Sequence, residues 1–411
     1  MKVVIAQKGS RAHFLDARCL FSRGMLAKLV IDWYAGDTVI SRLPPAVLPK
    51  PLAKALSARA PGLDARKIKS LNAWGILYRA YSSWARSRSK PYDAYLWSDR
   101  HFAGRVARLN LPEHDIFYTF SYAGLEALQA ARMRGAMTVL NQIDAGAFGF
   151  RLVAEEARRW PEYAKEDMSF PEAYFSRVQK EWEISDLVLV NSEWSRHALV
   201  EQGVSFSKIE VIPLAFERPM EQEKFQLRER SKKTRVLWLG TVSIGKGIQY
   251  LVEAARMLVD APVEFVVAGP LAVRQEALEG APHNIQWVGT IPRSQVADMY
   301  RTCDVFVLPT LSDGFAITQI EALAYGLPVI VTPNCGRVVQ DGETGFVIPC
   351  YSAESLAEAV LRFVEDPGLI DAMRPKCLAE AGKYTVEAYA DSLVSILDRH
   401  LGEREPKNGG R

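Results

Sequence analysis

The 411-residue sequence has no stretch of about 18 uninterrupted apolar residues, and its five cysteines form no C-x-x-C pair. Without a long apolar run we expect no membrane-spanning helix, and MKVVIA (1–6) enters a strand-like pattern without a signal-peptide profile. The wide spacing of the cysteines argues against a zinc site or a disulfide framework. These absences predict a cytoplasmic protein with reduced thiols.

Several ligand-binding fingerprints are also missing. No G-x-G-x-x-G follows any strand-like run, the first loop reading QKGSRAH (7–13), which disfavours a redox enzyme that binds a dinucleotide. The G-x-x-x-x-G-K-[ST] order of a Walker A loop is absent as well. No D-x-D triplet occurs, so the usual acidic pair that holds a metal ion on a diphosphate is lacking. We expect neither a metal ion nor a redox cofactor.

Apolar, strand-like runs alternate with helix-like segments through most of the chain. One set of runs falls between residues 3 and 216, and a second set falls between 235 and 349. Continuous Val, Ile and Leu runs separated by amphipathic helices are typical of parallel strands buried on both faces. A chain of 411 residues also exceeds what one core usually serves. The pattern predicts an α/β fold of two doubly wound, Rossmann-like parallel-sheet domains facing a central cleft.

The composition shifts along the chain suggest where these domains begin and end. We expect an N-terminal Rossmann-like domain at 1–217, a charged linker at 218–235 and a C-terminal Rossmann-like domain at 236–384. A helix at 385–402 could pack on either domain, including back on the first, and 403–411 has the composition of a disordered tail. Ligands of such folds bind at the carboxyl ends of the strands, so an active site is expected in the cleft.

The net charge of +3 hides an asymmetry between the two halves. Residues 1–220 carry 31 Lys and Arg against 23 Asp and Glu, and the segment 50–90 alone mixes ten basic residues and several aromatic ones with one acidic residue. Such a mixture can hold a helix at an anionic membrane surface or bind nucleic acid. The alternative is a solvated helical face with a few core aromatics. We expect no nucleic-acid partner and leave peripheral contact with the inner membrane face open.

The stretch SDGFAITQIEALAYGLP (312–328) places Asp313 and Glu321 on either side of a loop-to-helix junction. Gly314 would let the backbone approach a ligand, and the helix start would cradle a phosphate. The residues expected to donate backbone N–H groups there are Phe315, Ala316 and Ile317. Glu321 would accept from two ribose hydroxyls, so the spacing suggests a nucleotide-sugar. The alternative makes Asp313 a helix N-cap and Glu321 a surface residue.

A second stretch, LWLGTVSIGKGIQYLVEAARML (237–258), repeats the order of strand, loop and helix. Gly240 ends the strand-like run, and Lys246 stands directly before Gly247 at the expected helix start. The ammonium of Lys246 could neutralise charge that builds on a diphosphate leaving group. The alternative is an exposed lysine at a helix start.

The motifs of the second half, taken in order, resemble those of a known family. The pieces are the K-G helix start, VVAGP (266–270), NIQWVGTIP (284–292), CDVFVLPT (303–310), DGFAITQIEALAYGLPVI (313–330) and DGETGFVIP (341–349). Their order resembles glycosyltransferase family 4, within the group 1 glycosyl transferases, closely over about residues 180–385 and in outline before them. The resemblance implies the B-type two-Rossmann fold and sugar transfer with retention of anomeric configuration.

The resemblance also implies roles for single residues. Glu321 matches the family glutamate that holds the donor ribose, and Asp313 stands in the place of the glutamate that contacts the transferred sugar. Lys246 matches the phosphate lysine. An arginine usually follows the first glycine of that loop, whereas Thr241 follows Gly240 here. Thr241 and the shorter Asp313 are therefore departures from the family pattern at the donor site.

The first half offers its own candidate residues. Gln142 and Asp144 stand near the place of a family histidine–aspartate pair. Asp144 would orient the acceptor or take its proton; the alternative is a loop aspartate that caps the next helix. Gly9, in the first loop, would close on the phosphates. His13 and His197 are expected near cleft-side loops, where a single histidine is more often structural.

These observations converge on one expected activity. We expect a retaining, metal-independent, hexosyltransferase-type enzyme that uses a nucleotide-diphosphate-sugar as co-substrate and a glycan, lipid-linked or small-molecule acceptor. Lys246 and the helix start at Gly314 would supply the positive field, and the leaving phosphate would take the proton of the acceptor. Because Thr241 and Asp313 depart from the pattern, the alternative is a non-catalytic nucleotide-sugar-binding partner subunit or sensor.

Overall fold

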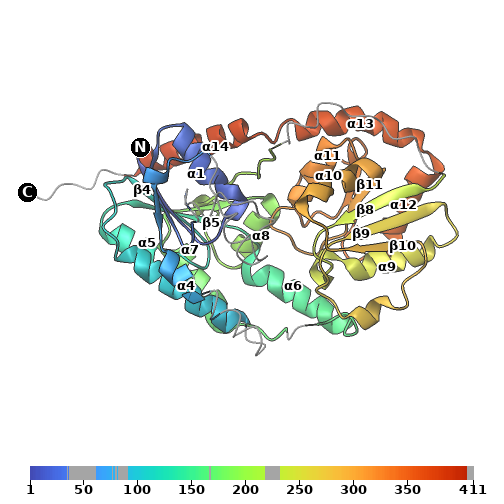
Figure 1. The fold of residues 1–411 in the computed structure, drawn as a ribbon, viewed down its shortest axis with the longest axis horizontal. Coiled ribbons are helices and arrows are strands. Elements are labelled where there is room, and N and C mark those ends of the chain that lie inside the picture. Colours follow the sequence, from blue (N-terminus) through green and yellow to red (C-terminus); the bar gives the residue numbers. More distant parts are fainter. Residues whose placement is uncertain are drawn as a thin grey trace, which may run out of the picture.

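The computed structural model describes residues 1–34, 36, 62–75, 77, 78, 81, 91–165, 168–217 and 232–404. Most of the basic segment 50–90, most of the expected linker 218–235 and the expected tail after residue 404 lie outside these residues. The chain forms two α/β units side by side, each a parallel sheet with helices on both faces (Figure 1). The predicted fold class is confirmed.

The first sheet, within the described residues, has the strand order β3-β2-β1-β4-β5-β6-β7, and all its pairs are parallel. Its strands are β1 (Val3–Gln7), β2 (Leu26–Ile31), β3 (Ile68–Ser70), β4 (Ile116–Phe120), β5 (Met137–Gln142), β6 (Leu187–Val190) and β7 (Ile209–Val211). The helices around it are α1 (Leu15–Ser22), α4 (Pro91–Ala107), α5 (Leu125–Met133), α6 (Gly146–Arg159), α7 (Glu172–Ile184) and α8 (Glu193–Glu201).

The second sheet has the order β10-β9-β8-β11-β12-β13, again with parallel pairs. Its strands are β8 (Thr234–Leu239), β9 (Val263–Ala268), β10 (Ile285–Gly289), β11 (Val305–Leu308), β12 (Val329–Val331) and β13 (Gly345–Val347). Its helices are α9 (Ile248–Met257), α10 (Arg293–Thr302), α11 (Ile317–Ala324), α12 (Ala353–Glu365) and α13 (Gly368–Ala381). β8 begins two residues before the domain boundary expected at 236.

Strand order reverses once in each sheet, and this positions the candidate site. In the first sheet β1 lies between β2 and β4, and in the second β8 lies between β9 and β11. The loops that leave these central strands on opposite sides open a crevice at the carboxyl edge of the sheet. The strands themselves are buried on both faces, as in β1 and β4, where every residue is buried.

The last helix, α14 (Val386–Glu403), packs against α1 of the first domain. Leu393 and Leu397 are fully buried in the core beneath the first sheet. The buried carboxylate of Asp16 accepts hydrogen bonds from the hydroxyls of Tyr389 and Tyr118, each at 2.7 Å. The chain therefore returns to its first domain after completing the second.

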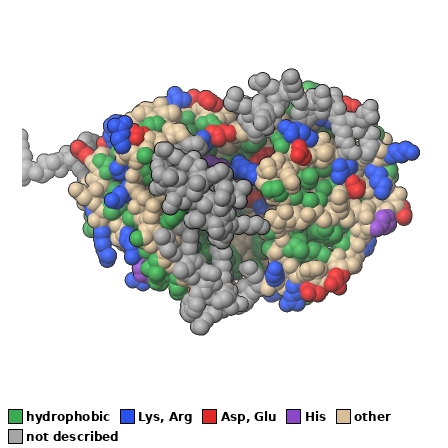
Figure 2. All heavy atoms as spheres, viewed as in Figure 1, with side chains coloured by type: hydrophobic (Ala, Val, Ile, Leu, Met, Phe, Trp, Pro, Cys, Tyr) green, Lys and Arg blue, Asp and Glu red, His purple; other side chains and the backbone are tan. Residues whose placement is uncertain are grey.

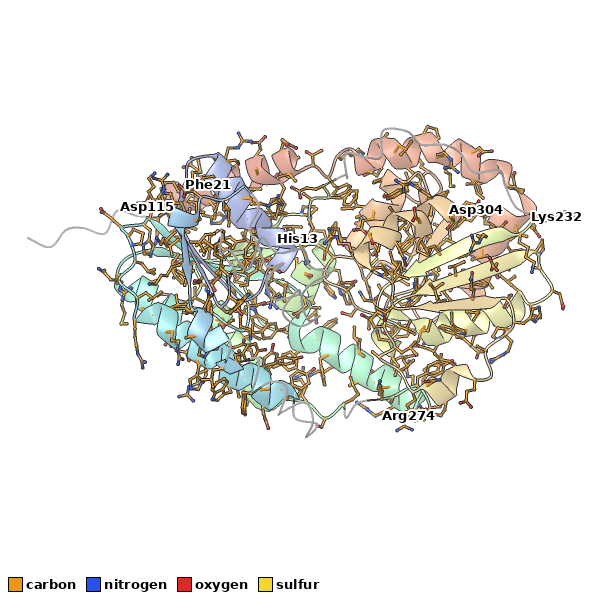
Figure 3. The ribbon with its side chains drawn as sticks, in the orientation of Figure 1. His13, Phe21, Asp115, Lys232, Arg274 and Asp304 are labelled. Carbon is orange, nitrogen blue, oxygen red and sulfur yellow. The ribbon has the colours of Figure 1, made fainter. Side chains whose placement is uncertain are left out.

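A second crossing runs the other way through α6 (Figure 1). Ala157, near the end of α6, and Tyr163 are buried in the core of the second domain. The segment continues along that domain, where the N–H of Arg274 donates to the Tyr163 carbonyl at 3.2 Å, close to the end of α6 (Figure 3). The first domain thus contributes part of the second domain's core.

The charge asymmetry of the sequence is not visible as a patch of one sign on the face drawn in Figure 2. Acidic and basic side chains intermingle over both domains on the face drawn in Figure 2. None of the described helices combines the length and the apolar character that a bilayer crossing requires. In the basic segment, Trp74 is buried and stacks on Tyr78 with ring centroids 5.6 Å apart, so these two aromatics belong to the protein interior.

Candidate active site between the two sheets

The loop from β11 to α11 is tied to the loop that follows β12. The N–H of Asp313 donates to the Asn334 carbonyl at 2.8 Å, and the N–H of Ala316 donates to the Cys335 carbonyl at 2.9 Å. α11 begins at Ile317, and its N-cap is Ala316. Two expectations are therefore wrong. Asp313 is not the N-cap of α11, because Ala316 holds that position. The N–H of Ala316 is not free for a ligand, because it donates to the carbonyl of Cys335 in the neighbouring loop.

Gly314 has a different use from the one predicted. A Cβ atom on Gly314 would lie 2.4 Å from the carbonyl oxygen of Ile143 and 3.0 Å from the side chain of Asn191. Its own carbonyl accepts a hydrogen bond from the hydroxyl of Ser192. The space beside Gly314 is thus filled by the first domain, and the glycine permits close contact between domains where ligand approach was expected. Its neighbour Phe315 is buried.

Lys246 and Asp313 come from separate motifs and form an ion pair through Nζ and Oδ2. Lys246 ends a short 3-10 turn, Ile244–Lys246, and the N–H of Leu311 donates to the Gly245 carbonyl at 2.9 Å, which brings the two loops together. Gly247 follows at φ 79°, where an added Cβ would lie 2.0 Å from the Pro309 carbonyl oxygen. Both charged side chains stay partly exposed, so the pair can be reached from solvent.

Gly240 and Thr241 stand at the carboxyl end of β8. Gly240 has φ 152°, and a Cβ on Gly269 would lie 1.7 Å from the Gly240 carbonyl oxygen. The two glycines therefore allow two neighbouring strand ends to approach closely. Thr241 is exposed just beyond them, so a short neutral hydroxyl occupies the loop position next to the ends of the central strands.

Glu321 lines a small pocket of about 80 Å³ between the two domains. Its carboxylate accepts a hydrogen bond from the hydroxyl of Tyr300 at 2.8 Å. Burial raises the pKa of this carboxyl, while Tyr300 and Arg293 oppose the increase. Half-buried and partnered, Glu321 is not a plain surface residue. The same pocket is lined by His13 of the first domain and by Ile317.

His13 lies in a turn of unusual backbone conformation. Three consecutive non-glycine residues, Ala12, His13 and Phe14, have φ of 44°, 51° and 61°. Such residues are costly unless the surroundings hold them, and they cluster at functional sites. His13 points toward the space between the domains (Figure 3), and its Nε2 meets the guanidinium of Arg293. Partial burial and Arg293 lower the pKa of His13, so the neutral ring accepts the Arg293 N–H.

Asp144 is held from several sides at the carboxyl end of β5. Its Oδ1 accepts from the Tyr122 hydroxyl at 2.7 Å, from Gln142 Nε2 at 2.9 Å and from the Gly146 N–H at 2.9 Å. The last contact reaches the first N–H of α6, but the N-cap of this helix is Ala145, so Asp144 is not its N-cap. The same contacts orient the carboxylate at the edge of the cleft, so a role toward an acceptor stays a prediction.

Two further first-domain candidates lie apart from this cluster. Gly9 has φ 75°, and its N–H donates to Asp32 Oδ1 at 2.7 Å. This N–H is therefore already bonded to the residue that follows β2. His197 is exposed on α8 beside the rings of Phe148 and Trp194, at 5.9 and 6.1 Å between centroids. His197 thus belongs to a surface aromatic group.

Other residues that shape the site escaped sequence reasoning. Tyr122 adopts φ 75°, and the buried carboxylate of Glu181 holds its loop by accepting the N–H groups of Tyr122, Gly124 and Leu125 at 2.6–3.0 Å. Arg293 was also missed. No local pattern marks these residues, because each acts on a segment far away in the sequence. Among the described residues, no group of three or more His, Cys, Asp or Glu side chains could hold a metal ion.

Solved structures share the fold along nearly the whole chain. One of them, the Anabaena protein HepE in complex with UDP-glucose, has a TM-score of 0.59 and 15% sequence identity, with 97% of this chain and 100% of that chain covered. At this identity the likeness concerns the fold alone. It agrees with two Rossmann-like domains that face one cleft.

Curated relatives match over part of their length. Alpha-D-kanosaminyltransferase of Streptomyces kanamyceticus is 27% identical over 195 residues, which are 44% of this chain and 50% of the relative. D-inositol 3-phosphate glycosyltransferase of Kribbella flavida is 26% identical over 257 residues, 56% of this chain and 61% of the relative. The matches thus span about half to three-fifths of these relatives.

A protein family matches the second domain together with the segment that leads into it. Residues 219–383 match the family described as Glycosyl transferases group 1. This range contains the loops that carry Lys246, Asp313 and Glu321, so the motifs read from the sequence and the family match fall on the same part of the fold. The match therefore confirms the resemblance to the group 1 glycosyl transferases that the motifs of this half of the chain indicated.

Proposed function

We propose that this protein is a glycosyltransferase of family 4 that moves a sugar from a nucleotide-diphosphate-sugar to a glycan, lipid-linked or small-molecule acceptor, with retention of configuration and without a metal ion. The observation that carries the proposal is the ion pair of Lys246 and Asp313, which joins two separate donor-site motifs at the carboxyl edge of the second sheet. The names of the curated relatives, which are sugar transferases, support it.

Each donor-site residue has a distinct task in this proposal. The donor diphosphate attracts the Lys246 ammonium, and the carboxylate of Asp313 then becomes available to hydroxyls of the transferred sugar. Glu321, partnered by Tyr300 in the pocket between the domains, accepts from the ribose. Lys246 stabilises the negative charge that develops on the leaving phosphate, which is the charge a divalent cation would otherwise neutralise.

The acceptor side follows from the position of Asp144. Its Oδ1 is occupied by three protein donors, whereas among the described residues no donor reaches Oδ2. Oδ2 is therefore the atom that orients an acceptor hydroxyl. The acceptor attacks from the face that the leaving group vacates, and the departing phosphate takes its proton, so no covalent protein intermediate is required.

The decisive experiment is a donor panel with product analysis. The full chain is incubated with UDP-, GDP-, TDP- and ADP-sugars and sugar acceptors, and the anomeric configuration of any product is determined by NMR, with EDTA in a parallel series. We expect transfer from one donor class, retention, and no loss with EDTA. Binding of a nucleotide-sugar without transfer to any acceptor would favour the sensor or partner-subunit alternative, and inversion would refute the proposed mechanism.

Peripheral membrane contact through 50–90 is a separate part of the proposal. The ten basic residues in this segment carry it. Flotation with anionic and with neutral liposomes tests it at low and high salt, because attraction to anionic lipid is screened by salt. Flotation that depends on neither lipid charge nor salt would refute an electrostatic membrane contact through this segment and leave the transfer reaction in place.

A further inference from the structure

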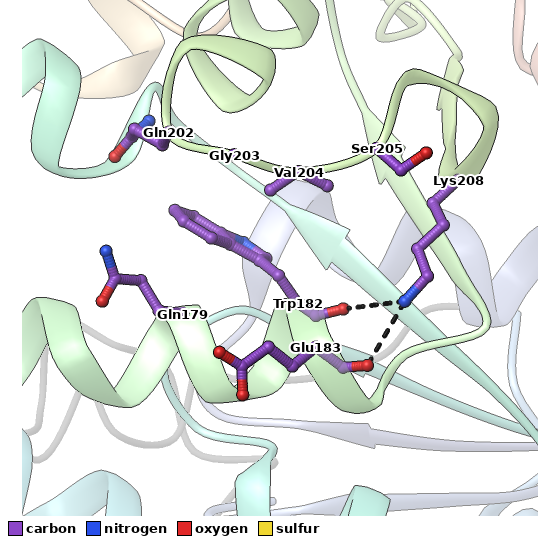
Figure 4. Close-up of a pocket in the computed structure, with 8 residues that line it drawn as sticks. All are labelled: Gln179, Trp182, Glu183, Gln202, Gly203, Val204, Ser205 and Lys208. Carbon is purple, nitrogen blue, oxygen red and sulfur yellow. Dashed lines mark hydrogen bonds between the residues drawn. The ribbon is translucent and has the colours of Figure 1, made fainter.

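A groove of about 520 Å³ opens on the first domain, apart from the cleft residues described above. It lies between the end of α7 and the loop that leads from α8 to β7 (Figure 4). Its volume falls within the roughly 300–1,000 Å³ of small-molecule sites. The side chains that line it include Gln179, Trp182, Glu183, Gln202, Ser205 and Lys208.

Trp182, which lines this groove, also supports the turn that carries Asp144. The indole of Trp182 is only 4% exposed, and its Nε1 donates to Gln142 Oε1 at 2.9 Å. Gln142 in turn donates from Nε2 to Asp144 Oδ1 at 2.9 Å. Two hydrogen bonds therefore connect the groove to the carboxylate on the acceptor side of the cleft.

Gln202 makes a second connection to the same turn. Its side chain donates to the Ala145 carbonyl at 3.0 Å and accepts the Phe148 N–H at 3.1 Å. A Cβ on Gly146 would lie 3.1 Å from Gln202 Oε1 and 3.3 Å from the Trp182 ring. The turn is thus packed closely against both side chains, and a ligand that shifts either one would shift the turn.

The charges of the groove argue against an ionic ligand. The carboxylate of Glu183 is offset by the ammonium of Lys208, which already donates to the carbonyls of Trp182 and Glu183 at 3.5 and 3.2 Å (Figure 4). A phosphate would meet Glu183 without a free cation, and a cation would meet Lys208. The Gln202 amide and the indole N–H already bond to the protein, Gln202 also donating to the Ala198 carbonyl at 2.6 Å. The groups left for a ligand are the exposed Gln179 amide, the Ser205 hydroxyl and the Glu183 carboxylate, which suit neutral hydroxyls beside the apolar part of Trp182.

We propose that this groove is a second saccharide-binding site, distinct from the donor and acceptor sites, that binds a neutral sugar. Gln179 and Glu183 hold its hydroxyls, and Trp182 contacts one face of the ring. Bound sugar steadies the Asp144 turn through Gln142 and Gln202. This last consequence, and it alone, rests on the proposed transferase function.

Fluorine NMR on the full chain labelled with 5-fluorotryptophan tests the site. The Trp182 signal is assigned with Trp182→Phe, and the probes are the methyl glycosides of glucose, galactose, mannose and N-acetylglucosamine. We expect a saturable shift of this signal with at least one glycoside. The double variant Gln179→Ala/Glu183→Ala should weaken the binding at least about tenfold, because two hydrogen-bonding side chains are removed.

Two control variants define the site. Lys180→Ala removes an exposed side chain from the same helix outside the groove lining, and Glu321→Ala alters the interdomain pocket; both should bind the glycoside as the wild type does. The inference is overturned if none of the glycosides shifts the Trp182 signal, or if the double variant binds as tightly as the wild type. A shift without any measurable sugar transfer would leave the groove in place and count against the proposed function instead.

Discussion

The two sheet edges that face each other across the cleft are held in different ways. On the second domain, backbone groups of neighbouring loops bond to one another, as Asp313 does with Asn334 and Ala316 with Cys335. Neutral amide side chains add to these bonds, since Asn334 donates to the Leu311 carbonyl and Gln319 to the Cys335 carbonyl, each at 2.8 Å. On the first domain, side chains from distant helices hold the loops, as the Glu181 carboxylate holds residues 122–125. Both arrangements satisfy the polar groups of loops that would otherwise be unpaired.

Substitutions at the two edges should therefore have different effects on stability and on activity. An edge held by its backbone leaves side chains such as Lys246 and Glu321 available for a ligand, so a substitution there should affect activity more than stability. An edge held by buried side chains couples stability to the geometry of Asp144 and Tyr122. Removing such a side chain should unfold or disorder this edge of the first domain before it changes any chemistry.

The strongest effect is expected for Glu181→Ala on the first domain. The substitution leaves three backbone N–H groups without their acceptor in a fully buried position. We expect the free energy of unfolding to fall by about 3–5 kcal/mol. Urea denaturation measures it, with the exposed Glu201→Ala on α8 as control. A loss no greater than that of the control would show that side chains do not hold this edge.

The next effect is expected for Lys246→Ala on the second domain. Loss of one group that stabilises developing charge costs about 10²- to 10³-fold in kcat. The thermal unfolding temperature should stay close to that of the wild type, because Lys246 is partly exposed. Transfer kinetics and circular dichroism measure the two quantities, with the exposed Lys232→Ala as control. Wild-type kcat in Lys246→Ala would refute the assignment of this residue.

A smaller effect is expected at the contact between the two edges. In Gly314→Ala the added methyl would press on the Ile143 carbonyl oxygen at 2.4 Å. Overpacking of this kind costs typically about 1–3 kcal/mol and would push the domains apart. Denaturation together with small-angle scattering detects both changes. Gly280→Ala, which has nothing within 4 Å of an added Cβ, is the matched control; equal behaviour of the two variants would contradict the contact.

The smallest effect concerns pH and His13. The folded protein lowers the pKa of His13 below its ordinary value of 6.5, through partial burial and through Arg293 and Arg18, with Glu217 opposing. The unfolded chain therefore binds the proton first, and stability should fall as the pH drops below 6.5 toward the folded pKa. His13 is largely exposed, so we expect a few tenths of a kcal/mol. Unfolding temperatures at pH 7.5 and 5.5 should differ less in His13→Asn than in the wild type.

Features that depend on local sequence could be predicted, whereas contacts between distant segments could not. The alternating apolar runs predicted both parallel sheets, because strand burial on two faces leaves a local signature. The motifs around Lys246 and Glu321 were readable because short loops after strands must combine glycine with the functional side chain. The N–H of Ala316, expected to donate to a ligand, instead donates to the Cys335 carbonyl, and the Cβ side of Gly314 faces the Ile143 carbonyl oxygen. Both contacts come from segments that the local sequence does not reveal.

By itself the sequence determined the two-sheet fold class, the resemblance of its second half to the group 1 glycosyl transferases and the motifs that bear the charged residues there. Only the tertiary structure decided that Lys246 meets Asp313 across 67 positions, that α6 crosses into the second core, and that a groove lies behind Asp144. The physical reason is the distance along the chain over which each kind of interaction acts. Periodicity and turn chemistry act between near neighbours in the chain, whereas buried polar pairs and close backbone approach depend on segments that only the folded chain brings together.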